Sequence, residues 1–107
     1  MKSHTIINKG FQYSIRTAEL VRYLQEQKKG FPLSEKLLSC GLEAGMHCRQ
    51  GEGEKDLHKL AAENIKKADF IIEMAVYAGY LTEKQSLPIR EEGSALLELL
   101  QQTEKST

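Results

Sequence analysis

Two cysteines and two of the three histidines are the residues of this sequence that could hold a metal ion. They are Cys40, His47, Cys48 and His58. On a helix, His47 and Cys48 would point about 100° apart and Cys40 would lie about two turns away, so the side chains would not converge. The sequence contains no Cys-x-x-Cys or His-x-x-x-His pair, the spacings typical of zinc sites. We therefore predict neither a metal site nor a cofactor site.

Cys48 beside His47 also suggests a thiolate nucleophile with a neighbouring base. Such a thiol needs a lowered pKa and a base held within hydrogen-bonding distance. A sequence neighbour on a helix is poorly aimed for that task, and the glycines that follow at positions 51 and 53 supply no orienting group. Nucleophile-elbow, phosphate-binding and metalloprotease motifs do not occur either. The sequence therefore predicts a protein that is not an enzyme.

Three lysines on one predicted helix could contact nucleic acid. Lys55, Lys59 and Lys66 fall within about 40° of one another on a helical wheel, which places them on one polar face. Repeated in an oligomer, this stripe would gain avidity for a phosphate backbone. Glu63 and Glu73 lie beside the stripe and reduce its charge. The stripe is either a solvated face or a weak RNA-binding site, and we favour the solvated face.

Segment 33–48 carries the pattern around which the other helices are expected to pack. Small residues recur there every fourth position, which places them on shared faces of a helix: Cys40, Gly41, Ala44, Gly45 and Cys48. Glycine inside a helix costs about 1 kcal/mol relative to alanine, so two glycines indicate a close approach of neighbouring backbones. We predict a central helix packed on more than one side, a feature of an assembly. The helix would also separate the two cysteines by about 12 Å, which excludes a disulfide between them.

The composition is that of an ordinary globular domain. The 107 residues are 40% hydrophobic and 28% charged, with 15 basic and 15 acidic side chains. A single domain over 1–107 can bury its own core at this length. Zero net charge disfavours a dedicated nucleic-acid or membrane-surface binder and does not oppose self-association. Apolar runs are too short to span a membrane and no signal-peptide pattern is present, so we expect a cytoplasmic protein.

The spacing of apolar residues predicts the first two helices. The first runs from an N-cap at Asn8 to about Lys29, with Gly30 just beyond its end. Its apolar positions cover about 220° of the wheel, more than the roughly 100° that one neighbour would bury. This arc indicates either a second contact, with another subunit, or a helix deep inside its own bundle. The second helix covers 33–48, with Ser34 as an alternative N-cap.

Two further helices are predicted in the second half of the chain. The third covers about 54–78, with Gly79 closing it. Asn64 falls in its apolar face, where we expect the amide to be hydrogen-bonded as part of the core. A capping box over 82–85 begins the last helix. Pro88 either kinks this helix or separates a short turn from a new helix.

Four helices joined by short loops predict an all-α, antiparallel up-down-up-down four-helix bundle. This single domain spans 1–107. Residues 1–7 and 104–107 are expected to be loosely ordered tails.

The order of these features resembles a known family. Residues 8–38 read NKGFQYSIRTAELVRYLQEQKKGFPLSEKLL, and residues 78–82 read AGYLT. Both segments resemble the bacterial four-helix-bundle proteins associated with intervening sequences of 23S ribosomal RNA genes, and the similarity covers most of 8–103. The accessory variability determinant of diversity-generating retroelements is a related group. The resemblance implies four antiparallel helices in a ring-shaped homopentamer and no established enzymatic activity.

The sequence departs from that family at the end of the second helix. Many members carry Ser-Ile-Gly-Ala-Asn followed by Glu-Ala, whereas this chain reads EAGMH over 43–47 and retains only Gly45. The retroelement protein is strongly basic, and this chain is neutral. We predict a non-enzymatic, homo-oligomeric helical scaffold or adaptor that works through protein contacts. The alternative is an RNA-associated accessory protein that binds weakly through the lysine stripe.

Overall fold

The chain folds into four helices that alternate in direction. The computed structural model describes residues 2–51 and 54–105, with side chains placed for 5–51 and 54–102. Within this part of the chain there is no strand, and the helices are α1 (Lys2–Gln25), α2 (Ser34–Gln50), α3 (Lys55–Tyr77) and α4 (Glu83–Lys105).

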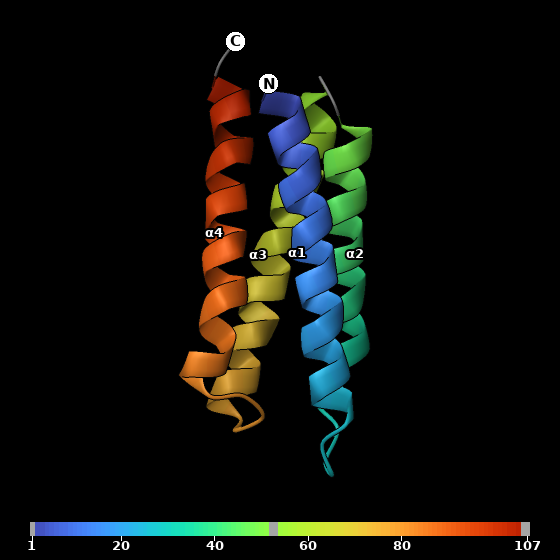
Figure 1. Ribbon diagram of the computed structural model, residues 1–107, viewed down its shortest axis with the longest axis vertical. Helices are drawn as coiled ribbons and strands as arrows, with labels where there is room; N and C mark the ends of the chain where they lie inside the picture. Colours follow the sequence, from blue (N-terminus) through green and yellow to red (C-terminus); the bar gives the residue numbers. More distant parts are fainter. Residues whose placement is uncertain (1, 52–53, 106–107) are drawn as a thin grey trace.

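Helices that follow one another in sequence are also neighbours in space. α1 packs on α2, α2 on α3 and α3 on α4, and α4 returns to contact α1. The helices run side by side along the long axis of a body that measures 47 × 20 × 18 Å (Figure 1). This arrangement confirms the predicted all-α, up-down-up-down bundle.

The hydrophobic core lies along the axis between the helices. Each helix contributes fully buried side chains, which include Tyr13, Leu24, Leu37, Ile65, Ile72, Leu96 and Leu100. Burial of one such aliphatic side chain contributes about 1.5–3 kcal/mol. The amide of Asn64, 9% exposed, donates to the Leu60 carbonyl at 3.0 Å, so the prediction of a hydrogen-bonded core residue is confirmed. None of the described helices combines the length and apolar character required to cross a membrane.

The junction between α3 and α4 begins as predicted. Gly79 adopts a left-handed φ of 86°. Its N–H donates to the Val76 carbonyl at 3.1 Å, and the Tyr80 N–H donates to the Ala75 carbonyl at 2.8 Å. These two bonds define a Schellman motif, which ends a helix through a glycine because other residues are strained at this φ.

The start of α4 is a reciprocal capping box. The Thr82 N–H donates to Gln85 Oε1 at 2.9 Å, and the Gln85 N–H donates to Thr82 Oγ1 at 3.1 Å. The helix then continues through Pro88 without interruption, so Pro88 does not divide it into two helices. The proline has no N–H to offer the preceding turn.

The ends of α1 differ from their predicted positions. α1 begins at Lys2, because Ile6 is buried at 2% exposure and extends the apolar face beyond Asn8. It ends at Gln25, five residues before Gly30, so neither the Asn8 cap nor the Gly30 terminator is correct. Residues 2–7 are therefore helical and not a tail.

The connection between α1 and α2 packs against the α3–α4 connection. The Gln27 side-chain amide donates to the Tyr80 carbonyl at 2.8 Å. The rings of Phe31 and Tyr80 lie 5.0 Å apart and are tilted by 55°. Ser34 is the first residue of α2, and its hydroxyl donates to the Phe31 carbonyl at 2.8 Å, so it does not act as the predicted N-cap.

The C-terminal boundary of α4 also needs correction. Residues 104 and 105, predicted as part of a tail, belong to this helix. Residues 1 and 106–107 of the predicted tails lie outside the described residues, as do residues 52–53 of the predicted break between the second and third helices.

Candidate interaction surfaces

The small residues of α2 pack against α1 within the same chain. A Cβ atom on Gly41 would lie 2.5 Å from Thr17 Cβ and 2.6 Å from Thr17 Oγ1. A Cβ on Gly45 would collide with the Ser14 hydroxyl and lie 3.0 Å from the Gly10 carbonyl oxygen. Glycine at both positions therefore permits the close approach of two backbones. α2 packs on two sides, as predicted, but these glycines contact its own bundle and not a second subunit.

The matching residues on α1 were not identified from the sequence. A Cβ on Gly10 would lie 2.7 Å from Cys48 Cβ. The Ser14 hydroxyl lies 2.6 Å from the Gly41 carbonyl oxygen and 3.2 Å from that of Gly10. Gly10, Ser14 and Thr17 are small residues at four- and three-residue spacing, the same pattern that distinguishes α2. That pattern would have indicated the partner helix.

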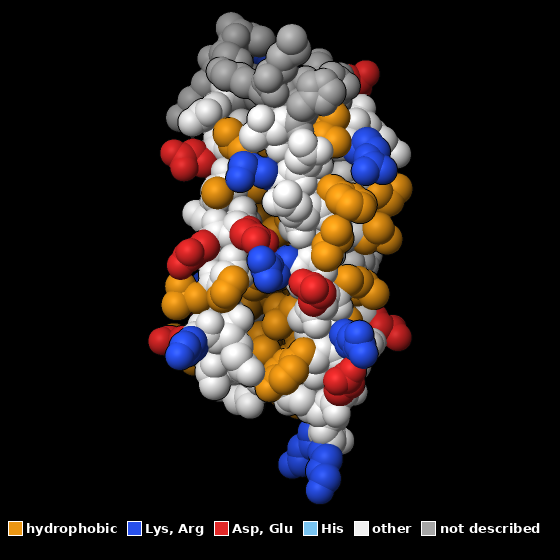
Figure 2. All heavy atoms as spheres, viewed as in Figure 1, with side chains coloured by type: hydrophobic (Ala, Val, Ile, Leu, Met, Phe, Trp, Pro, Cys, Tyr) orange, Lys and Arg blue, Asp and Glu red, His pale blue; other side chains and the backbone are white. Residues whose placement is uncertain are grey.

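One exposed apolar surface, the α1/α2 face, consists of Phe11 (52% exposed), Ile15 (45%), Leu38 (38%), Leu42 (54%) and Met46 (46%). A recess of ≈ 300 Å³ lies within it between Phe11, Leu42 and Met46. Arg49 lies at the edge of the recess, and its guanidinium is 5.3 Å from the centre of the Phe11 ring. Figure 2 shows hydrophobic side chains gathered over α1 and α2. Because Phe11 and Ile15 remain exposed, α1 is not buried entirely within its own bundle, and that alternative for its wide apolar arc is wrong.

A second apolar surface, the α2/α3 face, consists of Leu33, Phe70, Ile71, Met74 and Tyr77. Phe70 is 65% exposed and Tyr77 84% exposed, so both aromatic side chains protrude from α3. Beside Phe70 lies a groove of ≈ 690 Å³, whose lining includes three lysines and no carboxylate: Lys36, Lys66 and Lys67. This face was not predicted from the sequence. Phe70, Met74 and Tyr77 nevertheless follow one another at four- and three-residue spacing on the otherwise polar side of α3. That spacing would have indicated an apolar stripe there.

The three candidate lysines lie on one exposed side of α3. Lys55 and Lys66 are separated by about 16 Å along the helix axis. Lys66 stands between the α2/α3 groove and a second hollow on the α4 side of the helix. Glu73 lies in line with the lysines, and its carboxylate is 3.5 Å from the Arg90 guanidinium. The structure thus places the lysines together, and their contact with RNA stays a prediction.

The two cysteines are buried free thiols, which confirms that they form no disulfide with each other. Burial raises the pKa of Cys40, and it raises the pKa of Cys48 to about 11. A nucleophilic thiolate requires the opposite shift. His47 has a buried Nδ1 with no hydrogen-bond partner. Within the described residues, no group of three histidine, cysteine or carboxylate side chains is arranged to hold a metal ion.

The geometry defines an antiparallel four-helix bundle with two exposed apolar faces. No family model and no curated protein matches the chain. The fold is similar to the crystal structure of a protein of unknown function from the S23 ribosomal protein family of Bacteroides thetaiotaomicron. The TM-score is 0.93 at 20% sequence identity, and the match covers 99% of this chain and 100% of the other. At this identity the similarity establishes the fold.

Proposed function

We propose that the protein is a subunit of a homo-oligomeric helical scaffold or adaptor in the cytoplasm. We assign it to the bacterial family associated with 23S ribosomal RNA intervening sequences. Residues 8–38 and 78–82 support this assignment through their resemblance to the family, as does the S23 family description of the similar crystal structure. The family resemblance suggests five subunits in a ring. A further, unidentified protein partner would make the ring an adaptor.

The observation that carries the proposal is the pair of apolar faces on either side of α2. Monomeric proteins rarely expose large contiguous apolar patches, so two such faces indicate contact with other chains. The faces have different shapes: Phe70 and Tyr77 protrude from one, whereas the recess beside Phe11 and Leu42 lies in the other. A protrusion and a recess on different faces favour head-to-tail contacts, which generate rings when the rotation closes.

The protruding pair of aromatic side chains can supply much of the apolar area of one contact. A phenylalanine side chain buries about 150–250 Å² when fully covered. At 65% exposure, Phe70 would bury about 130 Å² more in a contact, which contributes about 3 kcal/mol. Tyr77 offers a similar area, so the protruding pair supplies a large part of the free energy of one interface.

Light scattering after size exclusion tests the proposal with one variant on each face. The wild-type protein should elute as one species whose mass is a multiple of 12.1 kDa. Phe70→Ser and Leu42→Ser should each dissociate it. Leu87, on α4, is 48% exposed and belongs to neither face, so Leu87→Ser should leave the mass unchanged. A wild-type protein that stays monomeric at micromolar concentration, whatever the dilution, would refute the assembly.

Mixing the two dissociated variants tests the head-to-tail geometry. Phe70→Ser leaves the α1/α2 face intact, and Leu42→Ser leaves the α2/α3 face intact. An equal mixture should therefore form a dimer through one intact contact, and that dimer cannot extend. If the interfaces instead joined identical faces, each variant alone would already dimerise through its intact face, and the head-to-tail arrangement would be wrong.

A second candidate function is that of an RNA-associated accessory protein. It is favoured by the exposure of Lys55, Lys59 and Lys66 on one side of α3. We expect weak binding that falls steeply with salt, because each phosphate contact releases counterions. Fluorescence anisotropy with a structured RNA should show no binding after all three lysines are replaced by glutamate. The control variant carries the same charge change at lysines outside α3: Lys9, Lys28 and Lys84. Tight binding at physiological salt that survives the triple substitution would contradict this assignment of the lysines, and no binding at low salt would exclude RNA.

A further inference from the structure

The α2/α3 groove has an apolar lining that the folded chain leaves open to solvent. Its apolar side chains come from the start of α2 and from α3, and they are Leu33, Phe70, Ile71 and Met74. Ile71 is 6% exposed and forms the floor, whereas Phe70 and Met74 are 65% and 41% exposed. The lining residues of α3 extend from Lys66 to Met74, which is about 12 Å along the helix axis. The groove is therefore long enough for about two turns of a helix laid along it.

Three lysines line the same groove from both of its sides. Lys36 belongs to α2, whereas Lys66 and Lys67 belong to α3. Burial raises the pKa of the Cys40 thiol, and the charges of Lys36 and Lys67 act against that shift, so both ammonium groups lie near this buried sulfur. Within the described part of the chain, none of the three lysines has an ion-pair partner. The two helices thus bring unpaired positive charges to one groove.

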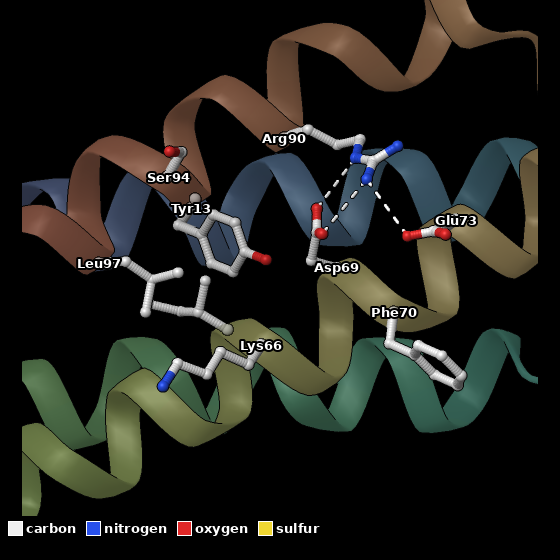
Figure 3. A pocket seen from close by; sticks show the side chains of 10 residues that line it. Tyr13, Lys66, Asp69, Phe70, Glu73, Arg90, Ser94 and Leu97 are labelled. Carbon is white, nitrogen blue, oxygen red and sulfur yellow. Dashed lines mark hydrogen bonds and ion pairs between the residues drawn. The ribbon is translucent and has the colours of Figure 1, made fainter.

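The carboxylates of the same helices do not line the groove. Glu43 and Glu63 lie outside its lining. Asp69 and Glu73 are paired with Arg90 of α4. Arg90 Nε donates to Asp69 Oδ1 at 3.0 Å, and Arg90 Nη2 lies 3.5 Å from Glu73 Oε2. Figure 3 shows both carboxylates directed to this arginine. The lining of the groove therefore carries three positive charges and no negative charge.

The neighbouring subunit of the proposed ring does not supply the missing negative charge. The recess on its α1/α2 face is lined by one charged side chain, Arg49, whose charge is also positive. The ring contact therefore leaves Lys36, Lys66 and Lys67 without counter-charges. A partner that matches the charge of the groove must bring carboxylates or other anions of its own.

The apolar floor distinguishes between the possible anionic partners. A phosphate backbone would pair with the lysines but would gain nothing from Leu33, Ile71 and Met74. An amphipathic helix places apolar side chains, spaced at four and three residues, in a hydrophobic groove and holds its charged side chains at the rim. Such a helix with acidic residues matches both the apolar floor and the lysines.

We propose that the α2/α3 groove binds an amphipathic helix of another protein that carries carboxylates beside its apolar face. The floor of the groove contacts the apolar side chains of this helix, and Lys36, Lys66 and Lys67 pair with its carboxylates. This inference rests on the proposed adaptor role and specifies the chemistry of the partner.

Fluorescence anisotropy with two designed peptides tests the proposal. Both peptides are alanine-based helices of about 18 residues with leucines at four- and three-residue spacing. One carries glutamates beside the leucines, and the other carries lysines at the same positions. The protein is used as the wild type and as Leu42→Ser, in which the substituted face is not the one that binds the peptide.

We expect the acidic peptide to bind with a dissociation constant of about 100 μM or tighter. The basic peptide should bind at least about tenfold more weakly, because like charges oppose the contact. An absence of binding by the acidic peptide at about 1 mM protein would overturn the proposal, and so would equal binding of the two peptides.

A matched pair of charge reversals locates the site. Lys36→Glu combined with Lys67→Glu should weaken binding of the acidic peptide at least about tenfold. The same change at Lys9 and Lys84, which lie on α1 and α4, should weaken it less than about twofold. Circular dichroism spectra should be unchanged in both double variants. Equal losses in the two double variants would refute the assignment to this groove.

An apolar pair of variants tests the contribution of the floor and wall. Met74→Ser should weaken binding of the acidic peptide about fivefold, because it removes apolar area from the groove. Leu87→Ser, at a similarly exposed position on α4, should not change it. Binding that is unaffected by Met74→Ser would contradict an apolar contact.

Three outcomes of the same measurements separate other occupants from the proposed helix. Binding by Leu42→Ser but not by an oligomeric wild-type protein would show that the neighbouring subunit fills the groove, and would refute a separate partner. A structured RNA that displaces the acidic peptide, and binds Met74→Ser as tightly as the wild type, would assign the lysines to nucleic acid and refute the helix. A wild-type protein that is monomeric and still binds the acidic peptide would refute the assembly and support this inference.

Discussion

Replacing Gly41 by alanine tests the close contact between α1 and α2. The new Cβ would lie 2.5 Å from Thr17 Cβ and 2.6 Å from Thr17 Oγ1. Thr17 cannot move aside easily, because it is fully buried and its hydroxyl donates to the Tyr13 carbonyl at 2.8 Å. Overpacking costs about 1–3 kcal/mol, and distances this short place the change near the upper value. Alanine returns about 1 kcal/mol of helix propensity, which leaves a net loss of about 2 kcal/mol.

Urea and thermal unfolding followed by far-ultraviolet circular dichroism measure this loss. For a domain of this size, we expect the melting temperature to fall by about 10 °C. Gly30→Ala is the matched control, because no atom lies within 4 Å of the position that its Cβ would occupy, and it should be neutral or slightly stabilising. Thr17→Ala in the Gly41→Ala background removes two of the colliding atoms and should restore part of the stability. A Gly41→Ala protein as stable as the wild type would refute the close-contact argument.

Two further predictions concern the last capping box and a buried thiol. Gln85→Ala removes one of the two reciprocal bonds with Thr82 and should lower the free energy of unfolding by about 1 kcal/mol. Gln85→Glu keeps an acceptor oxygen at this position and should retain most of the stability. Urea titration compares the two variants, and equal losses of stability would contradict the capping role. Burial raises the pKa of Cys48 from 9.0 to about 11, so the unfolded chain loses this proton first and stability should fall as pH rises from 9 to 11. The expected fall is about 2 kcal/mol more in the wild type than in Cys48→Ala, and identical pH profiles would contradict it.

The helices and the α3–α4 junction could be predicted because their determinants are local. Apolar spacing identifies a helix without reference to other elements, and Gly79 and the 82–85 box carry their own hydrogen-bonding partners. The ends of α1 depend on distant contacts. At the start of α1, Ile6 extends the helix by packing into the core. Beyond its end, the Gln27 side chain donates to the Tyr80 carbonyl in the α3–α4 connection. Neither contact has a local sequence pattern.

The surfaces were predicted only in part. The glycines of α2 indicated a close contact, but a four-residue pattern does not state which helix fills it, and Gly10 and Ser14 of α1 do so. The hollow between α3 and α4 could not be predicted at all. Its lining residues come from three helices, and their position depends on how far each helix is rotated about its own axis. That rotation is set by the packing of the whole core.

The glycine contact between α1 and α2 also has a consequence for the folding pathway. Large side chains attract one another while two helices are still apart, whereas glycine contributes no side-chain contact until the backbones reach their final distance and register. The contact should therefore form after the folding transition state. In that case Gly41→Ala would accelerate unfolding and leave the folding rate nearly unchanged, which corresponds to a φ-value near zero. The lifetime of the folded subunit, more than its folding rate, would then depend on the absence of side chains at Gly41 and Gly45 in α2.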